Sequence, residues 1–218
     1  MPDDKQIQDT YKTIAAKHTA PLPCGGEGGG SGSGFYSEKR SKFFAFSFHV
    51  ETEDDVKRIV AEYRKKYYDA RHVCYAYILG VDGVGNGVSY RMNDDGEPSS
   101  TAGKPIHGQI VKAELTDTLI IVVRYYGGVN LGTSGLIVAY REAALDCISN
   151  SMIEERTIEE KIDYTFAYPA MNDVMKIVKD LQPRIVSQTF DNTCSITLAI
   201  KQSMAPVLRQ RLEQLAFK

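Results

Sequence analysis

The chain has 218 residues and a formal net charge of −2, with 43% hydrophobic and 25% charged residues. Because domains commonly span about 100 to 150 residues, we expect two modest cores rather than one. No apolar run approaches the roughly 18 residues that a membrane helix needs, and the balanced charge excludes a bulk polycation, so nucleic acid would contact only a local patch.

The N-terminal quarter predicts two strands separated by a glycine-rich loop. The start, MPDDKQIQDT, lacks an apolar leader segment, which favours the cytoplasm. TYKTIA predicts an edge strand, Pro23 to Gly34 a mobile loop rather than a phosphate grip, and Phe35 to Val50 one long strand. The four cysteines lie far apart without a C-x-x-C pair, which fits reduced thiols and argues against a zinc site.

A helix is predicted to follow, with Thr52 as its N-cap. Its first turn carries acidic residues and its last turn carries Arg64, Lys65 and Lys66, an order that complements the helix dipole. A solvated helix end is the favoured interpretation of these three residues. An RNA-binding patch is the alternative.

The run ARHVCYAYILG, Ala70 to Gly80, predicts a strand with Val73 and Tyr75 on one face and His72 and Cys74 on the other. His72 beside Cys74 suggests a nucleophile, but no orienting third residue can be assigned, so a packed histidine is favoured. Residues 80–93 then predict a flexible hairpin loop and a short returning strand.

The stretch NDDGEPSSTAGKP, residues 93–105, sits before a predicted helix that Ser100 or Thr101 would cap, with Pro105 in its first turn. It is not a Walker motif, because the glycine spacing is wrong and proline replaces the magnesium-binding hydroxyl. Free N–H groups at the helix start, with Lys104, would suit a phosphate or carboxylate. The acidic residues Asp94, Asp95 and Glu97 fit a turn better than a metal site, so no metal is predicted.

The run TDTLIIVVRYYGG predicts a strand buried on both faces, followed by a helix that Thr133 or Ser134 would cap. GGVNLGTSG lacks the spacing of a dinucleotide site. Arg124 shares a face with apolar residues, where an unpaired charge is costly, so it should reach Glu97, Asp95 or a ligand anion.

Polar residues 151–160 predict a linker between a domain of residues 1–150 and a second of residues 161–218. The second domain reads as β-α-β-β-α, a ferredoxin-like plan without its last strand. Its predicted apolar stripes are Met171, Val174, Met175, Val178 and Leu181, then Met204, Val207, Leu208, Leu212 and Leu215.

ARHVCYAY, DDGEPSSTAGKP and RYYGGVNLGTSGLIVAY, in this order, resemble the YigZ/IMPACT family. The resemblance implies an α+β protein whose N-terminal domain is similar to the second domain of ribosomal protein S-five and whose C-terminal domain is similar to the last domain of elongation factor G. Eukaryotic members of the family regulate translation by competing for an activator of an initiation-factor kinase, whereas bacterial members have no settled activity.

Two functions remain open, and the oligomeric state is not predicted. The first is a translation-associated binding protein without catalysis or cofactor, contacting RNA or a ribosome-associated partner. The second is an enzyme or binding protein for a small phosphorylated or carboxylated metabolite. In this alternative the acidic loop supplies metal ligands or an acid or base, and the two helix starts are anion sites. The candidate binding residues are Thr101, Lys104, Arg124, Tyr125, Tyr126, Gly127, Gly128, Gly132, Thr133 and Ser134.

Overall fold

A computed structural model describes residues 9–16, 31–81, 87–190 and 193–215, which form two compact units. One unit comprises Lys12–Glu155, and the other comprises Arg156–Lys218 with the N-terminal residues up to Tyr11. In the described part of the chain, none of the helices combines the length and apolarity that crossing a bilayer requires.

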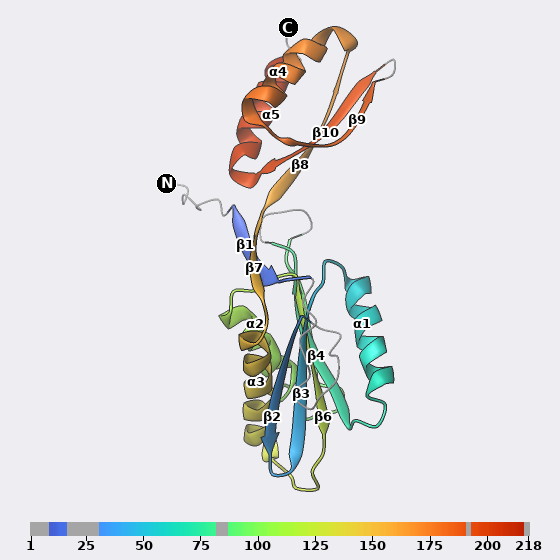
Figure 1. The fold of residues 1–218 in the computed structure, drawn as a ribbon, viewed down its shortest axis with the longest axis vertical. Helices are drawn as coiled ribbons and strands as arrows, with labels where there is room; N and C mark the ends of the chain where they lie inside the picture. Colours follow the sequence, from blue (N-terminus) through green and yellow to red (C-terminus); the bar gives the residue numbers. More distant parts are fainter. Residues whose placement is uncertain (1–8, 17–30, 82–86, 191–192, 216–218) are drawn as a thin grey trace. The chain divides into compact units, whose positions relative to one another are not determined.

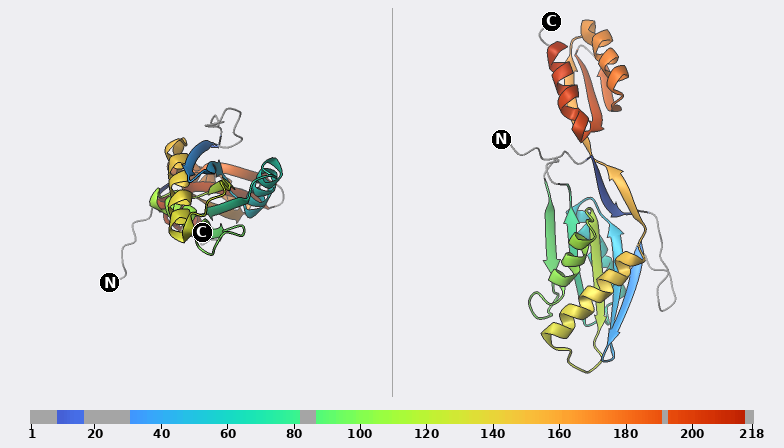
Figure 2. Two further views of the ribbon diagram at one scale, coloured as in Figure 1. Left: turned by 90° about the horizontal axis from the view of Figure 1, so that it is seen from below. Right: turned by 90° about the vertical axis from the view of Figure 1, so that its left-hand side faces the viewer.

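The first unit is built on a five-stranded sheet with helices on both faces (Figures 1 and 2). The strand order is β2-β3-β6-β4-β5, with α2 and α3 on one face and α1 on the other. The elements are β2 (Gly32–Glu38), β3 (Ser41–His49), α1 (Glu53–Lys66), β4 (His72–Leu79), β5 (Ser89–Asn93), α2 (Gly103–Lys112), β6 (Thr118–Tyr125) and α3 (Gly132–Ser149).

The central strands confirm the burial predicted from periodicity. β6 pairs antiparallel with β3 on one side and β4 on the other, and its residues Thr118 to Arg124 are buried. On β4, Cys74 packs into the core beneath α2 and α3, whereas Val73 and Tyr75 pack into the core beneath α1. Alternation along the chain therefore assigned each side chain to the correct face.

The prediction of one long strand from Phe35 to Val50 is wrong, because the chain reverses within it. β2 and β3 form a hairpin in which Glu38 pairs with Ser41, and the two turn residues Lys39 and Arg40 have φ of 45° and 66°. Two consecutive positive φ angles define the tight turn that matches strand twist. Glycine or asparagine usually marks such a turn, and neither is present here.

The three helix starts of this unit differ in how well the sequence predicted them. Thr52 caps α1 as predicted, since its Oγ1 accepts a hydrogen bond from the Asp55 N–H. The predicted side-chain caps of α2 and α3 are wrong, because these helices begin after Ala102 and Leu131 without a cap hydrogen bond from either side chain. Pro105 does lie in the first turn of α2.

Residues that we predicted as an irregular linker include a strand. β7 (Ile153–Thr157) forms a two-stranded sheet with β1 (Thr10–Ile14), the strand predicted from TYKTIA. Side chains along β7 alternate between exposed and half-buried, so its polarity reflects a partly solvated strand rather than a loop.

The second unit contains the predicted β-α-β-β-α order (Figure 1). An antiparallel sheet of order β8-β10-β9 packs one face against two helices. Its elements are β8 (Glu159–Phe166), a short 3-10 turn (Tyr168–Ala170), α4 (Met171–Leu181), β9 (Arg184–Phe190), β10 (Cys194–Lys201), a second 3-10 turn (Gln202–Met204) and α5 (Ala205–Leu215).

Some predicted members of the apolar stripes are exposed. Met175 of α4 and Val207 of α5 are 38% and 40% exposed, whereas Ile177 of α4 is buried. A period of 3.6 residues predicts which side of a helix is buried. It does not predict how wide the buried side is, so residues at the edge of an apolar stripe can remain exposed.

Three predicted loops fall largely or partly outside the described residues. These are most of the glycine-rich stretch, the tip of the hairpin loop before β5, and Asp191 and Asn192, which the sequence predicts as a hairpin turn. Within the glycine-rich stretch, Gly32, Ser33 and Gly34 are described and belong to β2, so the predicted loop extends too far toward the C-terminus.

Candidate functional site

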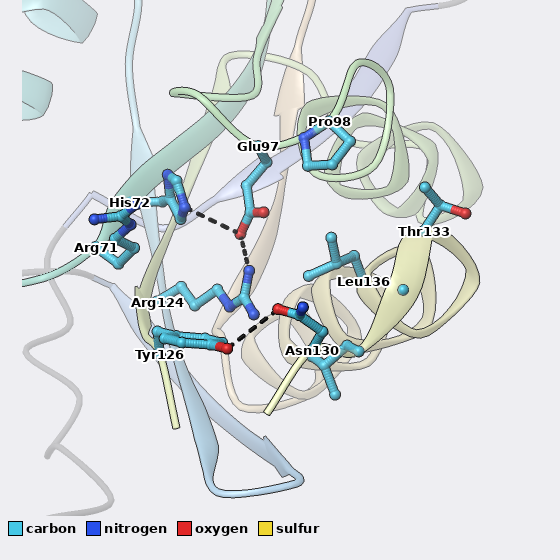
Figure 3. A pocket seen from close by; sticks show the side chains of 11 residues that line it. Arg71, His72, Glu97, Pro98, Arg124, Tyr126, Asn130, Thr133 and Leu136 are labelled. Atoms are coloured by element: carbon cyan, nitrogen blue, oxygen red, sulfur yellow. Dashed lines mark hydrogen bonds and ion pairs between the residues drawn. The ribbon is translucent and has the colours of Figure 1, made fainter. Parts of the chain in front are cut away.

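A pocket of about 600 Å3 lies on the α2 and α3 side of the first unit, near one end of the central strands (Figure 3). The residues that line it come from four separate segments of the chain. They are Arg71, His72, Glu97, Pro98, Arg124, Tyr126, Asn130, Leu131, Gly132, Thr133 and Leu136.

Strand pairing places the pocket's polar groups opposite one another. His72 at the start of β4 pairs directly with Arg124 near the end of β6, so the two side chains share one face of the sheet. Glu97 approaches from the loop between β5 and α2, and Thr133 and Leu136 come from the first turns of α3. The loop after β6 completes the pocket with Tyr126 and Asn130, whose side chains are joined by a hydrogen bond of 3.1 Å.

Arg124 is held rigidly at the base of the pocket. Its Nη1 donates to Glu97 Oε1 at 2.5 Å, and the two side chains are only 6% and 3% exposed. The guanidinium carbon lies 5.5 Å from the ring centres of both Phe43 and Tyr126, which adds cation–π attraction. Within the described structure its buried Nε has no hydrogen-bond partner.

Glu97 Oε1 is the centre of a buried hydrogen-bond network. It also accepts from the Tyr140 hydroxyl at 2.8 Å, and that hydroxyl in turn accepts from the Cys74 thiol at 3.3 Å. Burial raises the pKa of the Cys74 thiol and of the Tyr140 phenol, and the nearby Glu97 charge raises both further. Both groups therefore stay protonated at neutral pH.

The acidic residues next to Glu97 serve the structure around the pocket. Asp94 Oδ1 accepts from the N–H groups of Ala102 and Gly103 at 3.0 and 2.8 Å, so this carboxylate replaces the missing cap of α2. Asp95 accepts from the Val73 N–H and forms an ion pair with Arg64. Neither of these carboxylates lines the pocket.

His72 is a hydrogen-bonded histidine, as favoured from sequence. Its Nδ1 donates to the Asp95 carbonyl oxygen at 2.7 Å, which fixes the ring and leaves Nε2 directed toward Glu97 Oε1, 3.7 Å away. The Cys74 thiol is turned instead toward Tyr140 and the Asp94 carbonyl oxygen. The hydrogen bonds of these two side chains therefore do not pair His72 with Cys74.

The structure brings together only part of the predicted binding residues. Arg124, Tyr126, Gly132 and Thr133 line the pocket with Glu97. The other predicted residues lie elsewhere. Lys104 is exposed on α2, Tyr125 donates to Asp69 on the α1 side, Ser134 lines a different hollow, Thr101 donates to the Pro98 carbonyl, Gly127 packs against Arg40, and Gly128 lies in the loop after Tyr126.

Several pocket residues were not among the predicted set. The sequence around Arg71 and Asn130 shows no feature that predicts a binding residue, although both lie beside predicted elements. Leu131 and Leu136 are apolar residues, which indicate a core rather than a pocket. The pairing of β4 with β6 could have indicated Arg71 and His72, because two central strands that end together place their terminal side chains side by side.

Arg124 and His72 lie next to the Glu97 carboxylate, and Arg71 lines the pocket on the other side of His72 (Figure 3). Arg124 is neutralised in part by Glu97, while Arg71 is exposed and has no ion pair within the described residues. Within residues 9–16, 31–81, 87–190 and 193–215, no three His, Cys, Asp or Glu side chains come together in a way that suits a metal ion.

Comparison with known proteins confirms the resemblance noted in the sequence. The family model described as "Impact N-terminal domain" matches residues 39–148. An "IMPACT family member" of Haemophilus influenzae is 33% identical over 181 residues, which is 81% of this chain and 84% of that protein. The "IMPACT family member YigZ" of Escherichia coli is 26% identical over 162 residues, covering 74% and 78% of the two chains.

A solved structure shows that the fold is shared. A crystal structure of a protein described as hypothetical is similar with a TM-score of 0.67 at 23% identity, and the match covers 95% of this chain and 93% of the other.

Proposed function

The chain belongs to the IMPACT family, and on that premise we propose that it is a translation-associated binding protein without catalytic activity. It contacts RNA or a ribosome-associated partner, and the Arg124 pocket receives an anionic group of that partner. The resemblance to the family implies a role in translational regulation, which supports the proposed process, and the lining of the pocket supports the proposed mode of contact.

The observation that carries the proposal is the arrangement of the two pocket arginines. Arg124 is fixed by Glu97 and by the rings of Phe43 and Tyr126, so it is ordered before any ligand arrives. Arg71 is exposed at the rim and adds a charge that no described side chain neutralises. A preorganised arginine loses little conformational entropy when a phosphate or carboxylate binds.

Binding rather than catalysis is supported by the state of the nucleophilic candidates. Burial raises the pKa of the Cys74 thiol, so it does not form the thiolate that attacks a substrate. Tyr140 has its pKa raised by burial and its hydroxyl committed to Glu97, and Glu97 is committed to Arg124. These groups hold one another in place and leave no free general base among them.

RNA affinity measured across a salt series tests the proposal. Arg71→Ala should reduce the slope of log K against log salt by roughly 0.7 if this side chain contacts a single-strand phosphate. Lys104→Ala is the matched control, because Lys104 is also an exposed cation but does not line the pocket. A slope that Arg71→Ala leaves unchanged, or an equal change in both variants, would exclude RNA phosphate from the pocket.

The second candidate function, recognition of a small phosphorylated or carboxylated metabolite, is favoured by the size of the pocket. Its volume of about 600 Å3 lies within the range of roughly 300 to 1,000 Å3 typical of small-molecule sites. Native mass spectrometry of the purified protein and calorimetric titration with inorganic phosphate test this candidate. Loss of phosphate binding in Arg71→Ala, with RNA binding intact, would favour it over the first.

We also propose that the two units are separate domains. The strand order β8-β10-β9 with two helices on one face supports a ferredoxin-like domain without its last strand, and the five-stranded unit supports an S-five-domain-2-like fold. Limited proteolysis tests the division, because cleavage should fall in exposed connections. Cleavage spread through β4 to α3, with no preference for residues 150–160 or the glycine-rich stretch, would contradict it.

A further inference from the structure

One helix covers the α1 face of the five-stranded sheet, whereas two helices cover the opposite face. A helix is about 10 Å wide and neighbouring strands are about 4.8 Å apart, so α1 alone cannot cover five strands. Toward β2 and β3 this leaves aromatic rings open to solvent. Phe35 of β2 is 36% exposed and Phe44 of β3 is half-buried.

These rings continue across three neighbouring strands. Phe35 pairs with Phe44 in the β2–β3 ladder, and their ring centres are 5.1 Å apart. Tyr125 of β6 lies 6.1 Å from Phe44 and is held by the hydrogen bond that its hydroxyl donates to Asp69. Phe35, Phe44 and Tyr125 therefore form a row of ordered aromatic side chains, which we name the aromatic strip.

Basic side chains border the aromatic strip. Lys42 pairs with Tyr125 in the β3–β6 ladder, lies on the same face and is exposed. Lys66, in the last turn of α1, lies 5.6 Å from the ring centres of Tyr63 and Tyr67 and also borders a groove of about 450 Å3 beside the helix. Among the described residues, neither lysine forms an ion pair.

The acidic groups near the aromatic strip do not cancel these charges. Asp69 accepts from the Tyr125 hydroxyl, Asp146 accepts from the Phe35 backbone N–H at 2.8 Å, and Glu62 lines the groove. The exposed cations here are Lys42 and Lys66, with Arg40 in the hairpin turn and Lys65 in α1, whereas Lys39 lines a hollow with residues of α3 on the opposite face. The surroundings are therefore more basic than the chain as a whole, whose net charge is −2.

We propose that the aromatic strip binds single-stranded RNA, with bases stacking on Phe35 and Phe44 and phosphates contacting Lys42 and Lys66. Exposed rings beside unpaired cations are the features that sequence-tolerant single-strand binding requires, because every base has a π-face and every nucleotide a phosphate. A double helix keeps its bases stacked on one another and cannot use the rings. This surface lies on the face of the sheet opposite the Arg124 pocket, so the inference goes beyond the pocket's proposed role.

Fluorescence anisotropy with a labelled uridine oligonucleotide, and with an RNA duplex of equal length, tests the proposal. The wild type should prefer the single strand, and Phe35→Ala should weaken single-strand binding about tenfold, the usual effect of losing one stacked base. Phe35→Tyr should keep the affinity, because it keeps the ring. Lys42→Ala should reduce the salt slope by roughly 0.7.

Three controls keep the result specific to the aromatic strip. Tyr68→Ala removes an aromatic side chain that is 86% exposed outside the strip, and it should leave the affinity unchanged. Arg71→Ala changes the pocket alone. If Arg71→Ala loses RNA affinity while Phe35→Ala keeps it, the strip proposal is overturned and the pocket is the RNA site. The unfolding midpoint of each variant separates lost contacts from lost folding.

The proposal is overturned if the wild type binds no oligonucleotide or binds the duplex equally well. It is also overturned if Phe35→Tyr loses as much RNA affinity as Phe35→Ala, because the aromatic ring would then make no contribution to binding. A change of oligomeric state in Phe35→Ala, seen by analytical ultracentrifugation, would identify the surface as a contact between copies of the chain instead.

Discussion

Replacing Arg124 with alanine leaves the Glu97 carboxylate buried without its cationic partner. Both side chains are almost fully enclosed, with 6% and 3% exposure, and the ion pair between Arg124 Nη1 and Glu97 Oε1 is 2.5 Å long. Water that enters from the pocket can replace the lost partner only in part, because the Glu97 side chain is itself only 3% exposed. The substitution should therefore destabilise the first unit strongly, even though it lies at the base of a pocket.

The expected magnitude is about 3 to 5 kcal/mol. Breaking a buried ion pair by removing one partner costs roughly 3 to 5 kcal/mol. The lower part of that range applies because Glu97 still accepts from the Tyr140 hydroxyl at 2.8 Å. The lost contacts of the guanidinium with the Phe43 and Tyr126 rings add about 0.5 to 1 kcal/mol each at most.

Urea unfolding of four proteins measures the coupling of this pair: wild type, Arg124→Ala, Glu97→Gln and the double variant. The double variant should be more stable than Arg124→Ala alone, because an uncharged amide is cheaper to bury than a carboxylate. Equal m-values would show that the change lies in stability rather than in the extent of unfolding.

An unfolding midpoint that Arg124→Ala leaves unchanged would refute the structural role of the pair. So would additivity of the two single substitutions within about 0.5 kcal/mol, because residues in direct contact should show a coupling energy beyond that. Arg124 would then be available to a ligand alone.

Three further outcomes test the surrounding structure. Asp94→Ala should cost about 2 kcal/mol in urea unfolding because α2 loses its cap, and Asp94→Asn should recover part of that. Gly34→Ala should lower the free energy of unfolding by roughly 1 to 3 kcal/mol, since a Cβ there would lie 2.3 Å from the Cys147 nitrogen. Gly108→Ala on α2, where the space around the glycine is open, should raise it by about 1 kcal/mol. An unfolding midpoint equal to that of the wild type would contradict either prediction. Because burial raises the pKa of Cys74 and raises that of Cys147 to about 12, neither thiol should be alkylated by iodoacetamide in the folded protein at mildly alkaline pH, and mass spectrometry showing modification without urea would contradict this.

Sequence reasoning located the ion pair but not the pocket around it. An arginine on an apolar face of a predicted central strand requires a carboxylate, and Glu97 was one of two candidates nearby in the predicted turn. Lys104 was predicted to act with Arg124 because both border helix starts, yet Lys104 is exposed on α2 and does not line the pocket. Closeness to a motif in sequence does not fix the direction of a side chain.

The sequence also could not supply the caps of α2 and α3. Ser100, Thr101, Thr133 and Ser134 have the chemistry of an N-cap, and each stands within a few residues of a helix start. The α2 amides instead use the carboxylate of Asp94, eight and nine residues earlier in the chain. Selection among several acceptable caps depends on how the preceding loop folds, which local propensity does not describe.

By itself the sequence determined the buried strands β4 and β6, the start of α1 at Thr52, and the family to which the chain belongs. Those features depend on residues only a few positions apart, because the alternation of apolar side chains and the capping of a helix start are local patterns. Only the tertiary structure decided the reversal at Lys39 and Arg40 and the meeting of Arg71, Glu97 and Leu136 around Arg124. Such groupings depend on which strands pair and how helices pack on them, and that free energy comes from contacts between residues far apart in the chain.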